Sequence, residues 1–194
     1  MIWCSKKYVK SLEDIKHHIE LNNKLRNCKY DTLINTIFYG IKGCGKKTIV
    51  KAYVDNLITS YFNVKLEDIC ETMNKIKCKT NKKTEIFKYS KTKYYYVIDM
   101  IKLGKKRLHF FDEFIKSIIQ FKNVIGLPFN LIIIQNFDIF DYKLLTRFKQ
   151  YSEKYHKYTR IICISNQPRK ISKLTGYATI RIPQISKKET INIV

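Results

Sequence analysis

The segment YGIKGCGKKTIV, residues 39–50, has glycines and lysines spaced as in a phosphate-binding loop. Its glycines would let the backbone turn sharply and direct N–H groups at phosphate oxygens, while Lys46 would reach the outer phosphates of a nucleotide. A glycine-rich turn that carries a solvated lysine pair is the alternative. Phosphate binding is favoured because a strand is expected before the segment and a helix after it.

A second lysine stands at the position that usually carries a hydroxyl group. In an active loop the residue after the first lysine supplies a hydroxyl ligand to Mg²⁺, and an ammonium group cannot do this. Lys47 can instead donate a charge-assisted hydrogen bond to phosphate, and Thr48 supplies a hydroxyl only after a shift of register. We therefore predict a loop that binds ATP or ADP, with or without Mg²⁺, but does not support metal-assisted cleavage.

The acids that a nucleotide hydrolase needs are missing from their expected place. The buried strand in LIIIQNFD, residues 131–138, ends in Gln135 and Asn136, whose amides can neither act as a base nor replace a metal-binding carboxylate. Alternatively, Asp138 folds back to take that role. Another buried strand ends at Asn166, which either reads the terminal phosphate or forms the turn that follows.

These observations define the candidate site and its expected activity. The residues assigned to nucleotide binding are Gly40, Gly43, Cys44, Gly45, Lys46, Lys47, Thr48 and Asn166. We assign no catalytic residue and no metal ligand, and we expect negligible intrinsic ATPase activity.

Hydrophobic patterns predict the elements that position this site. Helices are expected at residues 11–27, 48–62, 107–121 and 141–158, and strands at 32–39, 85–90, 93–100, 130–134, 160–165 and 178–182. Residues 62–83 are polar and lysine-rich, with a short helix expected in LEDICETM and a loop at KCKTNKK. Strands that alternate with helices indicate one three-layer α/β domain with a mostly parallel sheet, as in P-loop NTPases.

Composition limits the partners. The 38 Lys and Arg residues outnumber the 16 Asp and Glu residues and give a formal charge of +22, which favours a polyanion such as nucleic acid. Alternatively, an AT-rich genome enriches Lys together with Asn, Ile, Tyr and Phe. No run approaches the ~18 apolar residues of a membrane span, so we expect an intracellular protein. The cysteines and histidines lack zinc-ligand spacing, which predicts free thiols and no structural metal.

Five blocks, in order, resemble a known family. They are WCSKKY (3–8), YGIKGCGKKT (39–48), LLTRFKQYSEKY (144–155), RIICISNQPRKI (160–171) and TIRIPQISKKE (179–189). Together they are similar to a small subunit of replication factor C, the AAA+ clamp loader, of the type whose phosphate loop reads GKKT. The resemblance implies an AAA+ core at residues 1–183, a remnant of the first lid helix at 184–194, and otherwise no lid or collar domain.

The resemblance also implies partners, and its departures limit the activity. Expected partners are other AAA+ clamp-loader-like subunits, a sliding clamp and primer–template DNA, at replication sites in a nucleus or a viral replication factory. The family's serine-arginine-cysteine box falls on Thr175, Gly176 and Tyr177, so the arginine finger is missing. The favoured hypothesis is a catalytically degenerate subunit that binds ATP or ADP structurally and contributes to DNA binding and clamp loading within a hetero-oligomer.

Two other functions stay open. The first is an interaction module of another DNA-linked assembly, for transcription or packaging, that holds no nucleotide. The second is a small P-loop nucleoside or nucleotide kinase, which Lys47 and the lack of an arginine cluster disfavour.

One helix is expected to carry a DNA contact. Lys143, Arg147, Gln150, Lys154 and Lys157 are spaced 4, 3, 4 and 3 residues apart, so they share one helix face. The corresponding helix of clamp loaders faces duplex DNA. The resemblance therefore implies DNA binding by Lys143, Arg147 and Lys154, and an ordinary solvated helix face is the alternative.

Overall fold

The computed structural model describes residues 11–15, 17–79, 84–120, 127–167, 174 and 176–184. Its strands are β1 (Thr36–Tyr39), β2 (Thr72–Lys79), β3 (Thr84–Lys91), β4 (Tyr95–Asp99), β5 (Asn130–Gln135), β6 (Thr159–Ser165) and β7 (Ala178–Arg181). Its helices are α1 (Ile19–Arg26), α2 (Lys46–Phe62), α3 (Arg107–Gln120) and α4 (Tyr142–Lys154), with 3₁₀ segments η1 (Leu66–Asp68), η2 (Met100–Lys106) and η3 (Phe137–Ile139).

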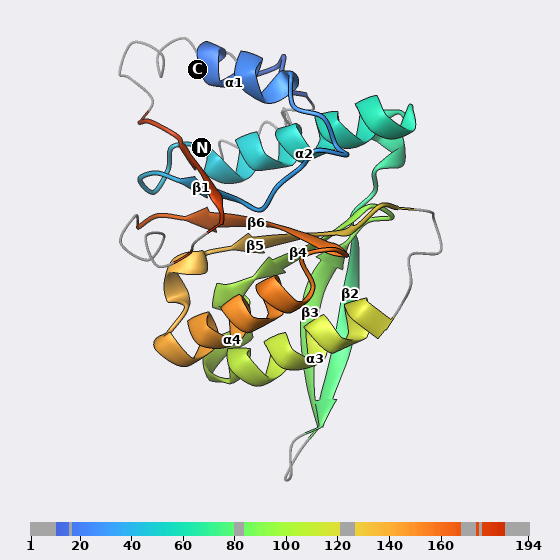
Figure 1. Ribbon diagram of the computed structural model, residues 1–194, viewed down its shortest axis with the longest axis vertical. Helices are drawn as coiled ribbons and strands as arrows, with labels where there is room; N and C mark the ends of the chain where they lie inside the picture. The colour runs from blue at the N-terminus through green and yellow to red at the C-terminus, as the bar shows by residue number, and fades with distance from the viewer. Residues whose placement is uncertain are drawn as a thin grey trace, which may run out of the picture.

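The strands form one mixed sheet in the order β2-β3-β4-β5-β6-β1-β7. From β4 to β7 every neighbouring pair is parallel, whereas β2 and β3 form an antiparallel hairpin that joins the edge of β4. Helix α2 covers one face of the sheet, with α1 packed on its outer side, and α3 and α4 cover the other face (Figure 1). The predicted three-layer α/β domain with a mostly parallel sheet is therefore confirmed.

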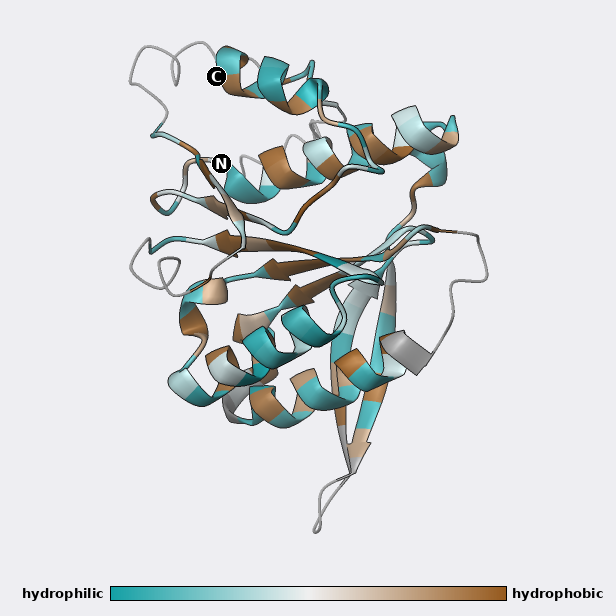
Figure 2. Cartoon of the chain, in the orientation of Figure 1, coloured by the Kyte–Doolittle hydropathy of each residue, from teal (hydrophilic) through white to brown (hydrophobic). Residues whose placement is uncertain are grey.

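The core explains why the central strands are apolar throughout. In β5, Leu131 and Ile133 belong to the core beneath α2, while Ile132 and Ile134 belong to the core shared with α3 and α4. A strand that is covered on both faces has no position left for polar side chains. The central strands are accordingly brown in Figure 2, whereas teal and brown alternate along the β2–β3 hairpin.

The first helix is shorter than predicted. It begins at Ile19, because His18 has φ 57°, a left-handed conformation that cannot continue a right-handed helix. The Ser11 N–H does donate to Oδ2 of Asp14 (2.9 Å), but this contact belongs to a turn rather than to a helix cap. The apolar spacing that suggested a longer helix reflects Leu12 and the turn after it packing into the core.

Strand β2 was not predicted. Its sequence TMNKIKCK lies in the segment expected to be a short helix followed by a loop, and the helical part is limited to η1. Asn74, Ile76 and Cys78 turn toward the sheet's covered side, while Lys75 and Lys77 stay exposed. Lys75, Ile76, Lys77 and Cys78 alternate as in a half-covered strand, but Met73 on the exposed side and Asn74 on the covered side break the alternation before them, so the strand signal was short. The predicted pairing of the next two strands is confirmed as β3 with β4.

Several expectations concern residues outside this description. The WCSKKY block, most of the expected lid remnant, and Thr175 are not among the residues that the structure describes. Within the described ranges, no helix is both long and apolar enough to cross a membrane.

Candidate nucleotide-binding site

The candidate loop connects β1 to α2 at the carboxyl edge of the parallel sheet. Gly43 (φ 91°) and Gly45 (φ 79°) adopt left-handed conformations that side-chain-bearing residues rarely take. Gly40 is needed for a different reason, because a Cβ atom there would lie 2.3 Å from the Ile182 carbonyl oxygen, just after β7. Backbone conformation and the neighbouring strand thus both favour the observed glycines.

Lys46 lies inside the loop rather than on its surface. Its side chain is buried, and Nζ donates to the carbonyl oxygens of Gly40 (2.8 Å) and Ile41 (2.5 Å). The Cys44 sulfur lies 3.6 Å from the same nitrogen. The loop therefore positions its ammonium group with its own backbone, and phosphate oxygens would exchange with these carbonyl acceptors.

The first turn of α2 provides further groups for an anion. A helix start leaves backbone N–H groups without intrahelical acceptors and carries partial positive charge. Here the N-cap Gly45 gives no side-chain cap, and the first turn contains no acidic residue. Lys46 and Lys47 add two cations at the same place, so the site suits a phosphate group.

A cavity of about 630 Å³ opens onto this turn and gathers most of the predicted residues. Its lining includes Gly43, Gly45, Lys46, Lys47, Thr48 and Asn166, together with Lys42, Asp99, Asn136 and Asp138. Gly40 and Cys44 do not line it but contact the Lys46 ammonium group. The residues assigned from sequence therefore converge on one place, some as cavity lining and some as support.

Asp99 is a residue of this site that was not assigned from sequence. It ends β4 and pairs in parallel register with Gln135, the end of β5. Asn136 Nδ2 donates to Asp99 Oδ1 (2.6 Å), and Lys47 Nζ lies 3.7 Å from Asp99 Oδ2. The signal was the aspartate near the end of KYYYVIDM, but its meaning depends on knowing that β4 and β5 are neighbours.

Asp138 supports Asn166 rather than replacing the missing acid. Its carboxylate accepts from Ser165 Oγ (2.6 Å), from the Asn166 N–H (2.5 Å) and from Asn166 Nδ2 (2.6 Å), with Gln167 N at 3.3 Å. Partial burial would raise the pKa of Asp138, but these hydrogen bonds outweigh burial and lower it. The carboxylate thus stays ionised and holds Asn166 at the cavity.

The cavity suits phosphate better than Mg²⁺. Thr48, Asp99 and the amide oxygen of Asn136 are the side-chain groups there that offer oxygen ligands to a phosphate-bound Mg²⁺ without disturbing Asn166. However, the Lys47 ammonium group lies against Asp99 and competes with a cation for it. Among the described residues, no group of three or more His, Cys, Asp and Glu side chains could hold a metal ion.

The predicted basic stripe lies on the exposed side of α4. Lys143, Arg147 and Lys154 are all exposed, whereas Leu144 and Phe148 are buried in the core. Arg147 Nε lies 3.7 Å from Asp112 Oδ1 on α3, and Lys154 Nζ lies 5.2 Å from the ring centroid of its neighbour, Tyr155. Lys157, the last member of the expected stripe, lies beyond the end of α4 at Lys154, so the helix is shorter than predicted. The part of the stripe on α4 has the expected geometry, but its arginine is partly neutralised.

The structure describes two of the three residues at the position expected for an arginine finger, Gly176 and Tyr177. Gly176 has φ 79°, a conformation that favours glycine over arginine. The next residue, Tyr177, packs against the core of α3 and α4, and its hydroxyl lies 2.6 Å from Ser152 Oγ. These two residues therefore have structural roles.

Solved structures share this architecture. One described as a DNA replication initiation factor aligns with 99% of this chain and 54% of its own chain, at 13% identity and a TM-score of 0.55. RIF2 of Saccharomyces cerevisiae aligns with 92% of this chain and 60% of its own, at 14% identity and a TM-score of 0.51. The present chain thus spans little more than half of the length of either structure. No protein-family model and no curated protein sequence matches it.

These likenesses show a common fold. The strand order and the loop after β1, described above, belong to that fold. The β1–loop–α2 unit, with β1 between β6 and β7, has the strand–loop–helix arrangement of the phosphate-binding unit in P-loop NTPases. The domain has the AAA+ P-loop NTPase fold, shared with a DNA replication initiation factor.

Proposed function

We propose that this chain is a nucleotide-binding AAA+ subunit that holds ATP or ADP without hydrolysing it at a useful rate. One observation carries this proposal. The phosphate loop keeps its glycine conformations, buried lysine and open helix start, while β5 ends in amides and the carboxylates Asp99 and Asp138 both contact other side chains.

Binding would use the loop as it stands. Phosphate oxygens would accept from the first N–H groups of α2 and from Lys46, and the half-exposed Lys47 would turn from Asp99 to phosphate. A charge-assisted hydrogen bond of this kind contributes roughly 1.5–3 kcal/mol. Lys47 therefore favours bound nucleotide, although it removes the usual hydroxyl ligand of Mg²⁺.

Hydrolysis would need a group that the site does not supply. The attacking water requires a carboxylate to orient it, and an arginine finger alone is worth about 10³–10⁵ in rate. Gln135 and Asn136 cannot act as bases, Asp138 is occupied with Asn166, and the Asp99 carboxylate is held by Asn136 and Lys47. In this proposal, other AAA+ subunits of a hetero-oligomer hydrolyse ATP.

The DNA-linked role rests on the exposed α4 stripe and on the resemblance to replication factor C small subunits. In this proposal Lys143, Arg147 and Lys154 contact primer–template DNA, and the subunit works with a sliding clamp at replication sites of a nucleus or viral factory. Replacing the three by Gln should lower the salt slope of duplex binding by about one for each phosphate contact. An unchanged slope would remove the stripe from the proposal.

A second candidate is favoured by one specific contact. Because the Lys46 ammonium group already donates to two loop carbonyls, the loop can keep its shape without phosphate. A loop that keeps its conformation without a ligand is what an AAA+-derived interaction module of a transcription or packaging assembly would need. Such a module would bind no nucleotide.

Titration with fluorescent ADP and ATP analogues tests the two candidates. We expect saturable binding by the wild-type chain and a loss of roughly 10- to 150-fold in Lys46→Ala, which lacks the charge-assisted bonds. Lys29→Ala, an exposed lysine outside the cavity, is the matched control and should bind normally. Absence of binding by the folded wild-type chain would favour the interaction module.

A further inference from the structure

The β2–β3 hairpin presents a lysine-rich face that the nucleotide site does not use. In the antiparallel register Met73 lies opposite Ser90, Lys75 opposite Lys88, and Lys77 opposite Ile86. Because side chains alternate along a strand, these residues point to one side of the hairpin. We call the six residues Met73, Lys75, Lys77, Ile86, Lys88 and Ser90 the lysine face.

The lysine face is uncovered. The opposite side of the hairpin packs Ile76, Phe87 and Tyr89 against the core of α3 and α4. On the lysine face, by contrast, Lys75, Lys77 and Lys88 are exposed, and Met73 and Ile86 are 60% and 56% exposed. The side of the hairpin that turns away from α3 and α4 is thus open to a partner.

The charges on this face are uncompensated. Lys75 and Lys88 are direct cross-strand neighbours, and like charges in that relation destabilise a sheet. None of the three lysines forms an ion pair within the described part of the chain, in contrast to Arg147 on α4, which contacts Asp112. A cluster that opposes folding and lacks acids is complementary to an external polyanion.

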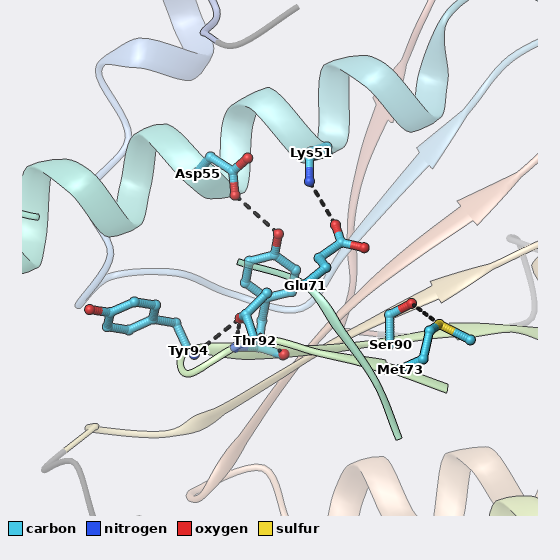
Figure 3. A network of polar contacts seen from close by, with 8 residues as sticks. Lys51, Asp55, Glu71, Met73, Ser90, Thr92 and Tyr94 are labelled. Carbon is cyan, nitrogen blue, oxygen red and sulfur yellow. Dashed lines mark hydrogen bonds and ion pairs between the residues drawn. The ribbon is translucent and has the colours of Figure 1, made fainter. Parts of the chain in front are cut away.

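The face continues into a second cavity. Met73, Lys88 and Ser90 also line a space of about 580 Å³ between the hairpin and α2, together with Lys51 and Lys102. Figure 3 shows its wall, where Lys51 contacts Glu71 (2.7 Å) and Ser90 Oγ donates to the Met73 sulfur (3.3 Å). The same cavity reaches Lys47 and Asp99, so positive side chains extend from the hairpin to the phosphate loop.

We infer that the lysine face binds the phosphodiester backbone of nucleic acid, without preference for base sequence. Lys75 and Lys77 are two residues apart on one strand, about 6.5 Å, which is comparable to the separation of successive phosphates along a strand. The exposed methylene and methyl groups of Met73 and Ile86 can rest on sugars or bases between these contacts. The lysine face lies apart from the α4 stripe, and none of its six residues lines the cavity at the phosphate loop, although the second cavity connects the face to Lys47.

The inference is tested with the full chain, in the absence of nucleotide, by fluorescence anisotropy of a labelled DNA single strand and of its duplex. The variant Lys75→Gln, Lys77→Gln, Lys88→Gln should lose about 100-fold in affinity at about 0.1 M salt, with the salt slope lower by roughly two to three. The matched control changes the exposed lysines Lys29, Lys65 and Lys93 to Gln and should keep the wild-type affinity and slope. The single strand and the duplex together identify which form the face prefers.

A second measurement needs no variant. Lysine acetylation followed by mass spectrometry should show Lys75, Lys77 and Lys88 protected by DNA in the wild-type chain, with Lys65 and Lys93 unprotected. Wild-type affinity and slope in the hairpin variant would overturn the inference, as would an equal loss in the control, which would reflect net charge alone. Binding of poly-L-glutamate as tight as that of DNA would also overturn it, in favour of an acidic protein. The α4 variant is measured in parallel, so failure of that part of the proposed function is seen separately.

Discussion

Lys47 Nζ lies 3.7 Å from Oδ2 of Asp99, so the additional lysine of the phosphate loop faces the carboxylate that ends the adjacent strand β4. Asn136, which follows the β5 end where an acid was expected, donates to the same carboxylate at 2.6 Å. The two departures from an active phosphate loop therefore belong to one cluster. A lysine replaces a hydroxyl, an amide replaces an acid, and both contact Asp99.

The first prediction follows from this cluster. Asp99→Asn removes a negative charge near the phosphate position and frees Lys47, so ADP affinity should rise by about fivefold. This corresponds to roughly 1 kcal/mol, the interaction of two charges about 4 Å apart in a water-like dielectric. Titration with a fluorescent ADP analogue measures the change, and Asp68→Asn, on the exposed segment η1, is the control. Weaker binding of ATP that depends on Mg²⁺ would instead identify Asp99 as a metal ligand.

The second prediction concerns catalysis. Phosphate release from ATP by the isolated chain should be the same in the wild type and in Lys46→Ala, because the strand end at Gln135 and Asn136 supplies no base. Single-turnover assays with radiolabelled ATP measure this, with unfolding curves to confirm that both proteins are folded. Turnover that disappears in Lys46→Ala would contradict the prediction.

Local patterns were sufficient for most of the fold. The apolar runs of β5 and β6 and the amphipathic α4 were identified because burial on both faces or on one helix face leaves a regular pattern. The pattern was not sufficient at β2, where the exposed Met73 and the inward-facing Asn74 break the alternation. It was also not sufficient before α1, where the left-handed conformation of His18 interrupts the helix that the apolar spacing suggested. In both cases tertiary contacts overrode the local signal.

The candidate site shows the same division between local and long-range information. The glycines and Lys46 form a continuous motif, and so they could be assigned from sequence. Asp99 is 37 positions before Asn136 in the sequence. The two residues meet at the cavity only because β4 lies beside β5 in the sheet. The role of Asp138 depends likewise on β5 lying beside β6, because its partner Ser165 ends β6 and its other partners, Asn166 and Gln167, come directly after.

The third prediction separates stability from binding on the hairpin. Lys88→Glu places an acid directly opposite Lys75, which should replace repulsion by attraction and raise the free energy of unfolding by roughly 0.2–1 kcal/mol. The same change should weaken DNA binding. Urea unfolding and anisotropy measure the two effects, and Lys93→Glu, in the turn before β4, is the control. Loss of stability together with loss of binding would show that the lysine pair serves the fold instead.

The fourth prediction concerns a buried carboxyl group beneath the second cavity. Burial raises the pKa of Asp55 from 3.8 to about 6, although Lys51 and the hydrogen bond from Tyr95 oppose the rise. Asp55 projects from α2 in Figure 3, and the hydroxyl of Tyr95, on β4, donates to its Oδ1 atom at 3.1 Å. The folded protein therefore binds this proton more tightly than the unfolded chain does.

The sign of the pH effect follows. The pKa of Asp55 is higher in the folded protein than in the unfolded chain, so proton binding to Asp55 stabilises the fold. This contribution is complete below about pH 4 and is lost as the pH rises through about 6. The lost free energy of unfolding is about 3 kcal/mol, since a tenfold change in proton affinity is worth about 1.4 kcal/mol. Asp55→Asn keeps an oxygen acceptor for Tyr95 but carries no charge. It should thus be more stable than the wild type above about pH 7 and nearly equal to it near pH 4.

Urea unfolding across this pH range measures the difference between the two proteins. Tyr95→Phe is the matched comparison, because it removes the hydrogen bond that opposes the rise of the Asp55 pKa while leaving the carboxyl group in place. It should raise that pKa further, so the protein should be less stable than the wild type and should lose more stability as the pH rises. Equal stability of Asp55→Asn and the wild type at every pH would contradict the assignment. In that case the Asp55 carboxylate would be as well solvated in the folded protein as in the unfolded chain.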